Sequence, residues 1–445
     1  MESKVYIDPY PKTMKMLGLE RINIDCGNNT SIVTPANIAK DMVALLPDEV
    51  FIPESKFLDI CCKSGIFLTS IREKLMNSKA MIEAIPDDKE RYKYITDNQL
   101  YGIAPNGQCQ MYSVRAVYGT LKADNPHILC FGAFDQYRTA CLNNNHKMLI
   151  DEMKKEFNTM KFDVVIGNPP YNKDIYLDFV TLGHTLASKY DCWITPAKWQ
   201  AKGGQKNEDF RKNIVPYMKE IVYYPDCSDI FSVMEYSGIA YYICEKKEQD
   251  EKLVRNISLK NEAINSEAKR KINFYCTLRN DIQNIITKRI LPTNSKPYTF
   301  NVYTNLKYGC VSPNNFNPER GVPNTYQVYG MISYTTHNMT VAQKVRIIET
   351  KNADIELKNA DRIIFTSDNI MECKSFKSYM DTKFIRYLLS ARVVGLSPVY
   401  DDNTFRFVPA PEAFDHIFTD QELYKKYNLI QEEINIIESV IKERK

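Results

Sequence analysis

The sequence predicts a doubly wound α/β fold in the first half of the chain and a second domain of α+β structure in the rest. Three observations support this prediction. Short apolar strands alternate with helical stretches up to residue 194, the chain of 445 residues exceeds the usual size of one domain, and its composition becomes strongly charged after Glu245. Strands separated by helices are typical of a parallel sheet that helices cover on both faces.

The elements of the first half follow from apolar periodicity and turn signals. The first helix is TPANIAKDMVALL, in which Thr34 can cap the helix and Pro35 suits the first helical position. A strand at 56–60 precedes a helix at 64–75. Further strands are expected at 99–104, 128–131, 162–166 and 191–194.

The second half divides into a bridge and a separate domain. The segments EKKEQDEKLVRN and EAKRKINFYCTLRNDIQNIITKRI predict a charged helical bridge at 246–298, between a first domain at 1–245 and a last domain at 299–445. Residues up to about Pro411 are rich in Tyr, Asn, Ile and Val and contain many turn signals, which favours irregular β structure. Two amphipathic helices follow, with Thr419 or Asp420 as the cap and Glu422 as its capping-box partner.

Composition limits the class of protein. Hydrophobic residues make up 44% and charged residues 25% of the chain, the balance of a soluble globular protein. No apolar run reaches the length of a membrane span and the N-terminus shows no export signal, so a cytoplasmic location is expected. Twelve scattered cysteines without a CxxC pair and only five histidines predict reduced, buried thiols and no metal site. The net charge of +3 does not decide whether nucleic acid is a partner.

The most specific motif is the loop Asn168-Pro169-Pro170-Tyr171, which directly follows the apolar strand FDVVIG. A parallel strand delivers its following loop to the carboxyl edge of the sheet, where doubly wound folds bind ligands. The prolines fix the backbone and remove donors, so an Asn amide oxygen and a neighbouring carbonyl offer two acceptors to one NH2 group. Tyr171 adds a flat face on which a base can stack.

These groups suit the transfer of a methyl group to an aryl amine. The lone pair of such an amine is delocalised into its ring, which makes the nitrogen a poor nucleophile. Two acceptors that hold the amine hydrogens favour a pyramidal nitrogen whose lone pair faces a methyl sulfonium, so positioning would supply the gain in rate. The alternative is an ordinary proline turn after a strand.

The second motif is FLDICCKSGIF at residues 57–67, a strand that runs through a turn of small residues into a helix. Such a turn lets the backbone approach a nucleotide-like ligand, and here it would hold the amino-acid end of S-adenosylmethionine. One glycine is not a GxGxxG fingerprint, so a plain strand-to-helix turn is the alternative.

With these motifs the chain resembles the amino-methylating DNA methyltransferases of restriction-modification systems, and more narrowly the adenine-specific methylase subunits of type II and type III systems. TPANIAKDMV resembles the family's cofactor-binding helix, DICCKSGIF its cofactor loop, YGIAPN the next strand end, ILCFGAFD the segment that contacts the cofactor's adenine, and GNPPY the catalytic loop. WITPAKW, YPDCSDIF and GIAYYICEKK resemble the later strands, and FRFVPAP the closing segments. The motifs stand in a gamma-like order, with the target-recognition region last.

The resemblance implies a class I S-adenosylmethionine-dependent methyltransferase domain, which is Rossmann-like, at 1–245 and a target-recognition domain that binds DNA at 299–445. It implies methyl transfer from S-adenosylmethionine to N6 of an adenine flipped out of double-stranded DNA, with double-stranded DNA and a restriction endonuclease as partners. The catalytic residues would be Asn168, Pro169, Pro170, Tyr171 and Phe231. The cofactor would contact Thr34, Pro35, Asp59, Cys61, Lys63, Gly65, Phe67, Ala104, Asp135 and Asn168.

Phe231 is expected to stack on the second face of the flipped base, because enzymes that flip bases recover stacking between aromatic or apolar side chains. A buried core position is the alternative, since most Phe side chains are interior. Trp193 and Trp199 are expected to be core or wall residues rather than base readers.

Two residues depart from the family pattern. Lys63 stands where many methyltransferases have a loop glycine, and Ala104 stands where an acidic residue commonly holds the ribose hydroxyls. Two other functions stay open: a protein-glutamine N5-methyltransferase, which shares the NPPY loop, and a catalytically inactive DNA-recognition subunit. The long region after Glu245 argues against the first. The intact Asn168 to Tyr171 loop argues against the second, which Lys63 and Ala104 keep open.

Overall fold

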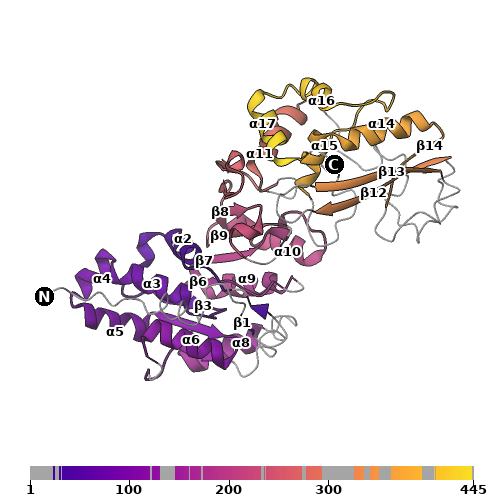
Figure 1. The fold of residues 1–445 in the computed structure, drawn as a ribbon. Coiled ribbons are helices and arrows are strands. Elements are labelled where there is room, and N and C mark those ends of the chain that lie inside the picture. The colour runs from indigo at the N-terminus through magenta and orange to yellow at the C-terminus, as the bar shows by residue number, and fades with distance from the viewer. Residues whose placement is uncertain are drawn as a thin grey trace.

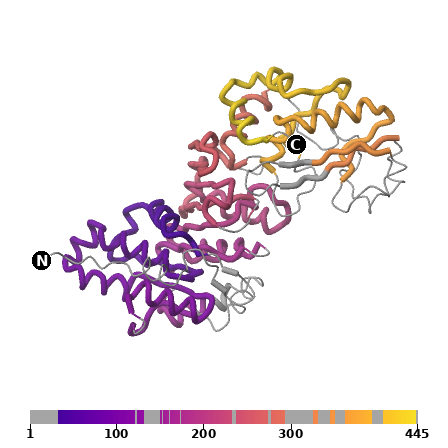
Figure 2. The backbone as a smooth tube through the Cα atoms, in the orientation of Figure 1, coloured from indigo at the N-terminus to yellow at the C-terminus, as the bar shows by residue number. Residues whose placement is uncertain are grey.

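The structure is a computed structural model, shown as a ribbon in Figure 1 and as a tube in Figure 2. In both views the indigo and magenta part of the chain forms one unit and the orange and yellow part forms a second. A short antiparallel pair, β1 (Ile24–Asp25) and β2 (Thr30–Ser31), precedes them. The residues described are 24–25, 30–31, 33–120, 123–130, 146–159, 161–171, 174–231, 235, 237–272, 277–292, 325–334, 341–349, 362–392, 405 and 407–442.

The large sheet has nine strands within the described residues and contains every strand that the sequence predicted for the first half. In spatial order they are β11 (Ser266–Arg270), β10 (Lys252–Asn256), β8 (Met218–Tyr224), β9 (Ile239–Glu245), β7 (Ala187–Pro196), β6 (Phe162–Gly167), β3 (Phe57–Asp59), β4 (Leu100–Ala104) and β5 (Ile128–Cys130).

The strands β3 to β7 pair in parallel, as predicted. The chain adds β4 and β5 on one side of β3 but β6 and β7 on the other, so its direction of growth reverses between β3 and β6. The sheet as a whole is mixed rather than parallel, because β9 is antiparallel to β7 and β8, and β11 to β10. Among the described residues no α-helix lies between β8 and β9 or between β10 and β11. Strands joined by such a short connection pair antiparallel, because a parallel pair needs a longer crossover connection.

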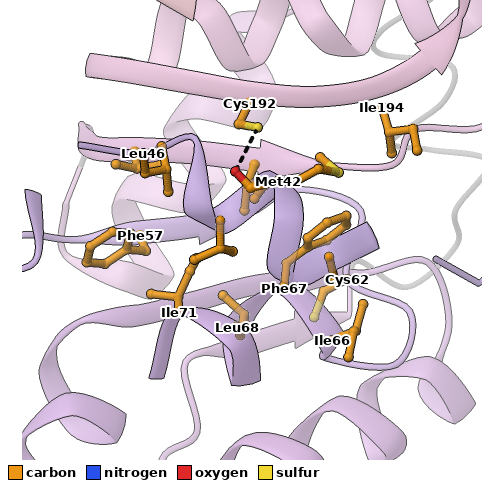
Figure 3. Packing of buried hydrophobic residues seen from close by; sticks show 14 of the residues in the cluster. Met42, Leu46, Phe57, Cys62, Ile66, Phe67, Leu68, Ile71, Cys192 and Ile194 are labelled. Atoms are coloured by element: carbon orange, nitrogen blue, oxygen red, sulfur yellow. Dashed lines mark hydrogen bonds between the residues drawn. The ribbon is translucent and has the colours of Figure 1, made fainter. Parts of the chain in front are cut away.

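Helices cover both faces of this sheet, as the doubly wound prediction requires. Successive strand residues face opposite cores: Phe57 packs on one side and Leu58 on the other. Figure 3 shows the first core, where Met42 and Phe67 meet the Phe57 face. The helices on this side are α2 (Ala36–Ala44), α3 (Ile66–Met76), α4 (Lys79–Ala84), α5 (Asp88–Asn98) and α6 (Gly107–Tyr118), and those on the other are α8 (His146–Phe157), α9 (Ile175–Leu186) and α10 (Gln205–Asn213).

The start of the first helix differs from the prediction in one detail. Helix α2 begins at Ala36, Pro35 is its N-cap, and no side chain caps it. The predicted Thr34 cap is therefore wrong, because the Thr34 hydroxyl is engaged by a residue far along the chain, Asn168.

The segment 246–298 does not form a helix throughout. Residues 252–256 and 266–270 are the strands β10 and β11, which extend the first domain's sheet. The abundant charges fit a strand because they pair across it: the Arg255 guanidinium lies 2.7 Å from the Glu220 carboxylate and 2.6 Å from that of Glu267. Besides a short 3-10 turn at Glu262–Ile264, the helices among the described residues of this segment are α11 (Asn280–Ile285) and the π-helix η8 (Ile286–Ile290), which pack into the C-terminal core.

The C-terminal unit is α+β, with a three-stranded antiparallel sheet of order β13 (Val341–Glu349), β12 (Tyr326–Tyr334) and β14 (Arg362–Ser367). Two helices, α14 (Ile370–Asp381) and α15 (Lys383–Ser390), lie where irregular β structure was expected. Their aromatic and β-branched residues favour strands by composition, but the apolar ones recur at helical spacing and fill the core.

The predicted helical pair near the end is confirmed as α16 (Asp420–Lys426) and α17 (Gln431–Val440). The Thr419 hydroxyl caps α16 by accepting from the Glu422 backbone N–H at 3.3 Å. The Glu422 carboxylate does not complete a capping box in the contacts seen here, since it lies 2.8 Å from Nε2 of His416. No helix among the described residues has the length and apolar composition that a membrane crossing requires.

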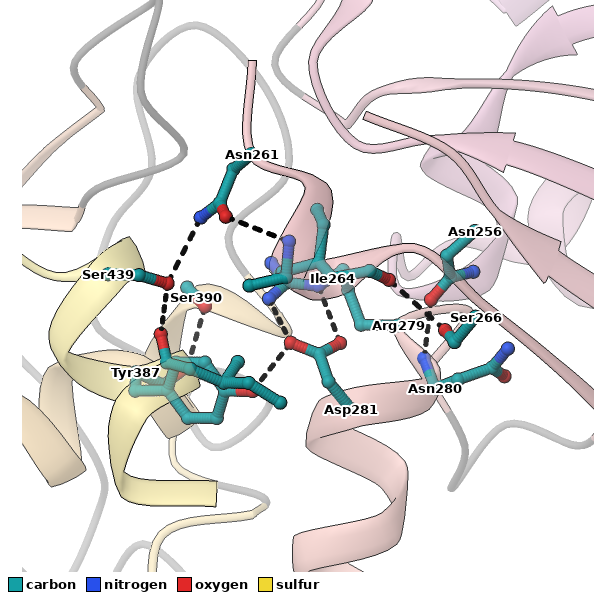
Figure 4. A network of polar contacts seen from close by, with 12 residues as sticks. Asn256, Asn261, Ile264, Ser266, Arg279, Asn280, Asp281, Tyr387, Ser390 and Ser439 are labelled. Carbon is teal, nitrogen blue, oxygen red and sulfur yellow. Dashed lines mark hydrogen bonds and ion pairs between the residues drawn. The ribbon is translucent and has the colours of Figure 1, made fainter. Parts of the chain in front are cut away.

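Buried polar contacts join the two units at the carboxyl edge of the large sheet. The backbone carbonyl of Gln200, just after β7 in the turn η4 (Ala197–Gln200), accepts from Arg392 of the C-terminal unit at 3.2 Å. Its side-chain oxygen accepts at 2.9 Å from the N–H of Leu278, which packs in the core of the first unit shortly before α11. Figure 4 shows the neighbouring network, in which Arg279 pairs with Asp281 and the Tyr387 hydroxyl donates to Asp281 at 2.6 Å. The C-terminal unit is thus anchored beside the strand ends.

Candidate active site

Two predicted loops lie at the point where strand order reverses. Strands β3 and β6 are parallel neighbours, with Asp59 in register with Ile166, so the loops that follow them leave the same edge side by side. One loop carries Asp59 to Gly65 and the other Asn168 to Tyr171. The carboxyl edge at such a switch point is where open α/β sheets bind ligands.

Asn168 is tied to Thr34 across 134 residues of sequence. Its amide nitrogen donates to the Thr34 hydroxyl at 3.0 Å, and both side chains are buried. Because the amide NH2 is directed at Thr34, the amide oxygen faces away from it as an acceptor. Two predicted site residues from separate motifs are therefore in contact, and the start of α2 orients the Asn168 carboxamide.

Tyr171 and Phe231 are also brought together. Their ring centroids lie 6.4 Å apart and the ring planes meet at 68°, an edge-to-face contact. Phe231 is buried, at 3% exposure, while Tyr171 is half-buried and its hydroxyl points inward. A base cannot stack on both rings in this arrangement, since their planes are not parallel. One of the two rings would have to turn before both could stack on the same base. In this structure Phe231 packs in the hydrophobic core.

The Tyr171 hydroxyl is buried. It has no hydrogen-bond partner among the described residues, and burial raises the pKa of Tyr171 well above its usual value. The nearby Cys227 and Glu235 raise it further. The phenol is therefore neutral at physiological pH, and the chemistry open to Tyr171 is packing through its ring rather than proton transfer.

Asp59 is the buried charge of the cofactor-type loop. It is 1% exposed, and its carboxylate accepts from the Cys61 N–H at 2.9 Å. Burial raises the pKa of Asp59 to about 7, while the Cys61 N–H, the Cys62 side chain and the charge of Lys63 act in the opposite direction. A carboxyl group poised near neutral pH at a strand end is typical of a ligand-binding site.

This raised pKa predicts how the ligand-free protein responds to pH. The folded form keeps the Asp59 proton up to about pH 7, whereas the unfolded chain loses it near 3.8, so folding stability falls as pH rises between these values. Asp59→Asn keeps an oxygen for Cys61 but cannot ionise. We expect its melting temperature to decline less than that of the wild type from pH 5 to pH 8. Parallel melting curves for the two proteins would contradict the assignment.

Gly65 has a packing reason to be glycine. It adopts φ +77°, and a Cβ there would come within 3.2 Å of the Ser113 Cα on α6. The turn therefore passes close to α6 and starts α3 immediately afterwards.

The remaining predicted cofactor residues divide into edge and core positions. Pro35 and Lys63 are half-buried, and Cys61 is buried with its N–H on Asp59. Phe67 and Ala104 are buried, and Figure 3 shows Phe67 within the first core. Pro169 is buried and Pro170 half-buried beside Asn168. Asp135 lies outside the described residues.

One pair at this edge was missed by the sequence reasoning. Lys198, in η4, lies 2.9 Å from the Glu235 carboxylate, which is 9% exposed, and Glu235 is close enough to Tyr171 to affect its pKa. Lys198 lies in the WITPAKW segment, Glu235 stands in none of the quoted motifs, and 37 positions separate the two, so only the pairing of β7 with β9 brings them together.

The sequence around this edge matches a known protein family. Residues 98–173, which include β4, β6 and the NPPY loop, match the family model described as Eco57I restriction-modification methylase. The chain is 26% identical over 337 residues to an uncharacterized adenine-specific methylase of Mycoplasma pneumoniae, an alignment that spans 60% of this chain and 79% of that protein.

Similar solved structures include two from type I systems. The methyltransferase subunit from Streptococcus thermophilus has a TM-score of 0.35 and 14% identity, over 52% of this chain and 48% of that one. The type I restriction enzyme EcoKI M protein has a TM-score of 0.38 and 14% identity, over 52% of this chain and 49% of that one. This chain thus spans about half of each. The segment that carries the NPPY loop matches a family of restriction-modification methylases, and over 60% of its length the chain is similar to an adenine-specific methylase.

Proposed function

We propose that the chain is a site-specific DNA methyltransferase that transfers a methyl group from S-adenosylmethionine to the N6 amine of an adenine flipped out of double-stranded DNA. One observation carries the proposal: the Asp59 loop and the Asn168 loop follow neighbouring parallel strands at the switch point of the sheet. A cofactor on the first loop and an amine on the second would meet at one edge. The family match and the adenine-specific relative support the enzyme class.

The described residues fit the amino-acid end of this cofactor. Helix α3 begins at Ile66 beside the edge, and the N–H groups of its first turn favour a carboxylate, while Asp59 offers a buried acceptor for a cation. The end of β4 fits the ribose less well. Ala104 has no side-chain acceptor, and the Asn106 side-chain oxygen already caps α6 by accepting from the Cys109 N–H at 2.8 Å. When bound, the cofactor would supply an electrophilic methyl group.

The chain's own residues would position the amine. The Asn168 amide oxygen, oriented by Thr34, and a backbone carbonyl of the proline loop would accept the two amine hydrogens and direct the lone pair outward. Tyr171 would stack on one face of the base through its ring, and Phe231 on the other after a ring turns. The rate gain would come from holding this geometry, since no described side chain there needs to ionise.

The C-terminal unit would recognise DNA. It is joined to the catalytic edge through Gln200, so a duplex bound by residues 299–445 would reach the Asn168 loop. In this division residues 1–245 form the methyltransferase domain, with β10 and β11 of the 246–298 segment as an extension of its sheet. We also propose that the motifs follow the gamma-like order, with the target-recognition region last, and that a restriction endonuclease is a partner of the chain.

Mass spectrometry of nucleosides tests the function. DNA from cells that express the protein should contain N6-methyladenine at one short sequence, and DNA from cells expressing Asn168→Ala should not. N4-methylcytosine as the sole product would refute the choice of base. Methylated glutamine in a protein, with unmodified DNA, would refute the enzyme class.

A further inference from the structure

The segment 258–264, which follows β10, contacts both the loop that carries Phe231 and the C-terminal core. We call residues 225–231 the Phe231 loop; it follows β8 and contains the 3-10 turn η6 (Cys227–Asp229). Because β10 pairs in parallel with β8, the chain leaves both strands at the same edge, and the two segments lie side by side. The Phe231 loop lies in the YPDCSDIF motif, whereas the 258–264 segment stands in none of the quoted motifs.

Lys260 binds the Phe231 loop at its turn. Its ammonium donates to the Asp226 carboxylate at 2.7 Å and to the Ser228 hydroxyl, and lies 3.9 Å from the Asp229 carboxylate. The neighbouring Leu259 N–H donates to Asp229 at 2.9 Å. Two consecutive residues of the segment therefore hold both carboxylates of the loop.

The Asp226 carboxylate also helps to define the shape of the loop. Asp226 caps η6, with its other oxygen accepting from the Ser228 N–H at 2.9 Å, and the Phe231 N–H donates to the Cys227 carbonyl at 2.9 Å. The Asp226 and Asp229 side chains are only 5% and 1% exposed. Burial raises the pKa of Asp229, Asp226 raises it further, and Lys260 opposes them. Without Lys260, two nearly buried carboxylates would repel each other within one turn.

The other side of the segment belongs to the C-terminal unit. The Asn261 amide donates to the Ser439 hydroxyl on α17 at 3.2 Å, a contact drawn in Figure 4. Ile264, in the turn η7 (Glu262–Ile264), is fully buried in the C-terminal core. A shift of α17 relative to the large sheet would therefore act on the residues that directly follow Lys260.

We propose that Lys260 is a positioning residue for Phe231. Through the 258–264 segment, the position of the C-terminal unit relative to the large sheet would then affect the position of the Phe231 ring. The inference rests on the proposed function, in which Phe231 stacks on the flipped base. Lys260 touches neither base nor cofactor in this account. It holds the Asp226 and Asp229 turn, and the turn holds Phe231.

The test compares Lys260→Ala with Lys271→Ala in the full-length chain. Lys271 is a matched control, because it forms an exposed ion pair with Asp250 at 2.8 Å at the opposite end of the β10–β11 hairpin. Hydrogen exchange of residues 225–231 should accelerate in Lys260→Ala and stay at the wild-type rate in Lys271→Ala. Lys260→Arg should restore protection, since the charge and a donor are kept. Equal exchange in all variants would overturn the proposal, whatever reaction the protein catalyses.

The catalytic consequence is measured on DNA that carries the sequence methylated by the wild type. We expect kcat of Lys260→Ala to fall roughly 10-fold to 100-fold, as for a misplaced contact group, with the dissociation constant of S-adenosylmethionine unchanged. The 2-aminopurine signal at the target position should change in Lys260→Ala but not further in a Phe231→Ala background, because Lys260 acts through Phe231. Additive effects would overturn the positioning role, and a wild type without methyl transfer would instead refute the proposed function.

Discussion

Replacing Asn168 by alanine should lower the rate of methyl transfer by about 1,000-fold, the loss typical of removing one preorganised hydrogen-bonding group. The reason is that the target amine would lose one of its two acceptors and keep its lone pair delocalised. Cofactor affinity should stay close to that of the wild type, since Asn168 acts on the amine. A tritiated-methyl assay and isothermal titration with S-adenosylmethionine measure the two effects separately.

Thr34→Val tests whether the Thr34 hydroxyl orients the Asn168 carboxamide. It removes the hydroxyl that accepts from the Asn168 amide at 3.0 Å but keeps a branched side chain of similar shape. We expect an intermediate loss of about 10-fold, because the carboxamide would be present but less well oriented. Retained turnover in Asn168→Ala would rule out the amine-clamp role, and full activity in Thr34→Val would show that its hydroxyl does not orient the amide.

Replacing Gly183 by alanine should cost about 3 kcal/mol of folding stability, at the upper end of overpacking penalties. A Cβ at Gly183 would lie 2.2 Å and 2.3 Å from two ring atoms of Trp193, which is fully buried. The ring cannot easily move, because its Nε1 donates to the buried Asp191 carboxylate at 2.7 Å and Gly167 lies close to it on β6. The helix propensity gained by alanine, about 1 kcal/mol, is too small to compensate.

Gly107→Ala provides the comparison for this effect. Gly107 is the first residue of α6, and a Cβ there would meet nothing within 4 Å. Urea unfolding of the full chain should show a clearly lower midpoint for Gly183→Ala and an unchanged or slightly higher one for Gly107→Ala. Similar midpoints for the two variants would mean that the space around Trp193 relaxes without cost.

The sequence predicted the strands of the first half well because most of them are buried on both faces and read as short apolar runs. Residues 57–59, 100–104 and 162–167 form strands where such runs were expected. It predicted β10 and β11 poorly, because both strands are short and contain Lys, Arg or Glu, and a charged segment also suits a helix. Whether such a segment forms a strand or a helix depends on whether a neighbouring strand, here β8, is available to pair with it.

The sequence by itself determined the NPPY loop, the Asp59 turn and the alternation that places both at one sheet edge, because each depends on local residue order and on the direction of parallel strands. Only the tertiary structure decided that Thr34 contacts Asn168, that Phe231 lies edge-on to Tyr171, and that Lys260 binds the Phe231 loop. These contacts join residues 134, 60 and 34 positions apart. Local propensity carries no information about such pairs, since they form only when elements far apart in the sequence meet at one edge of the sheet.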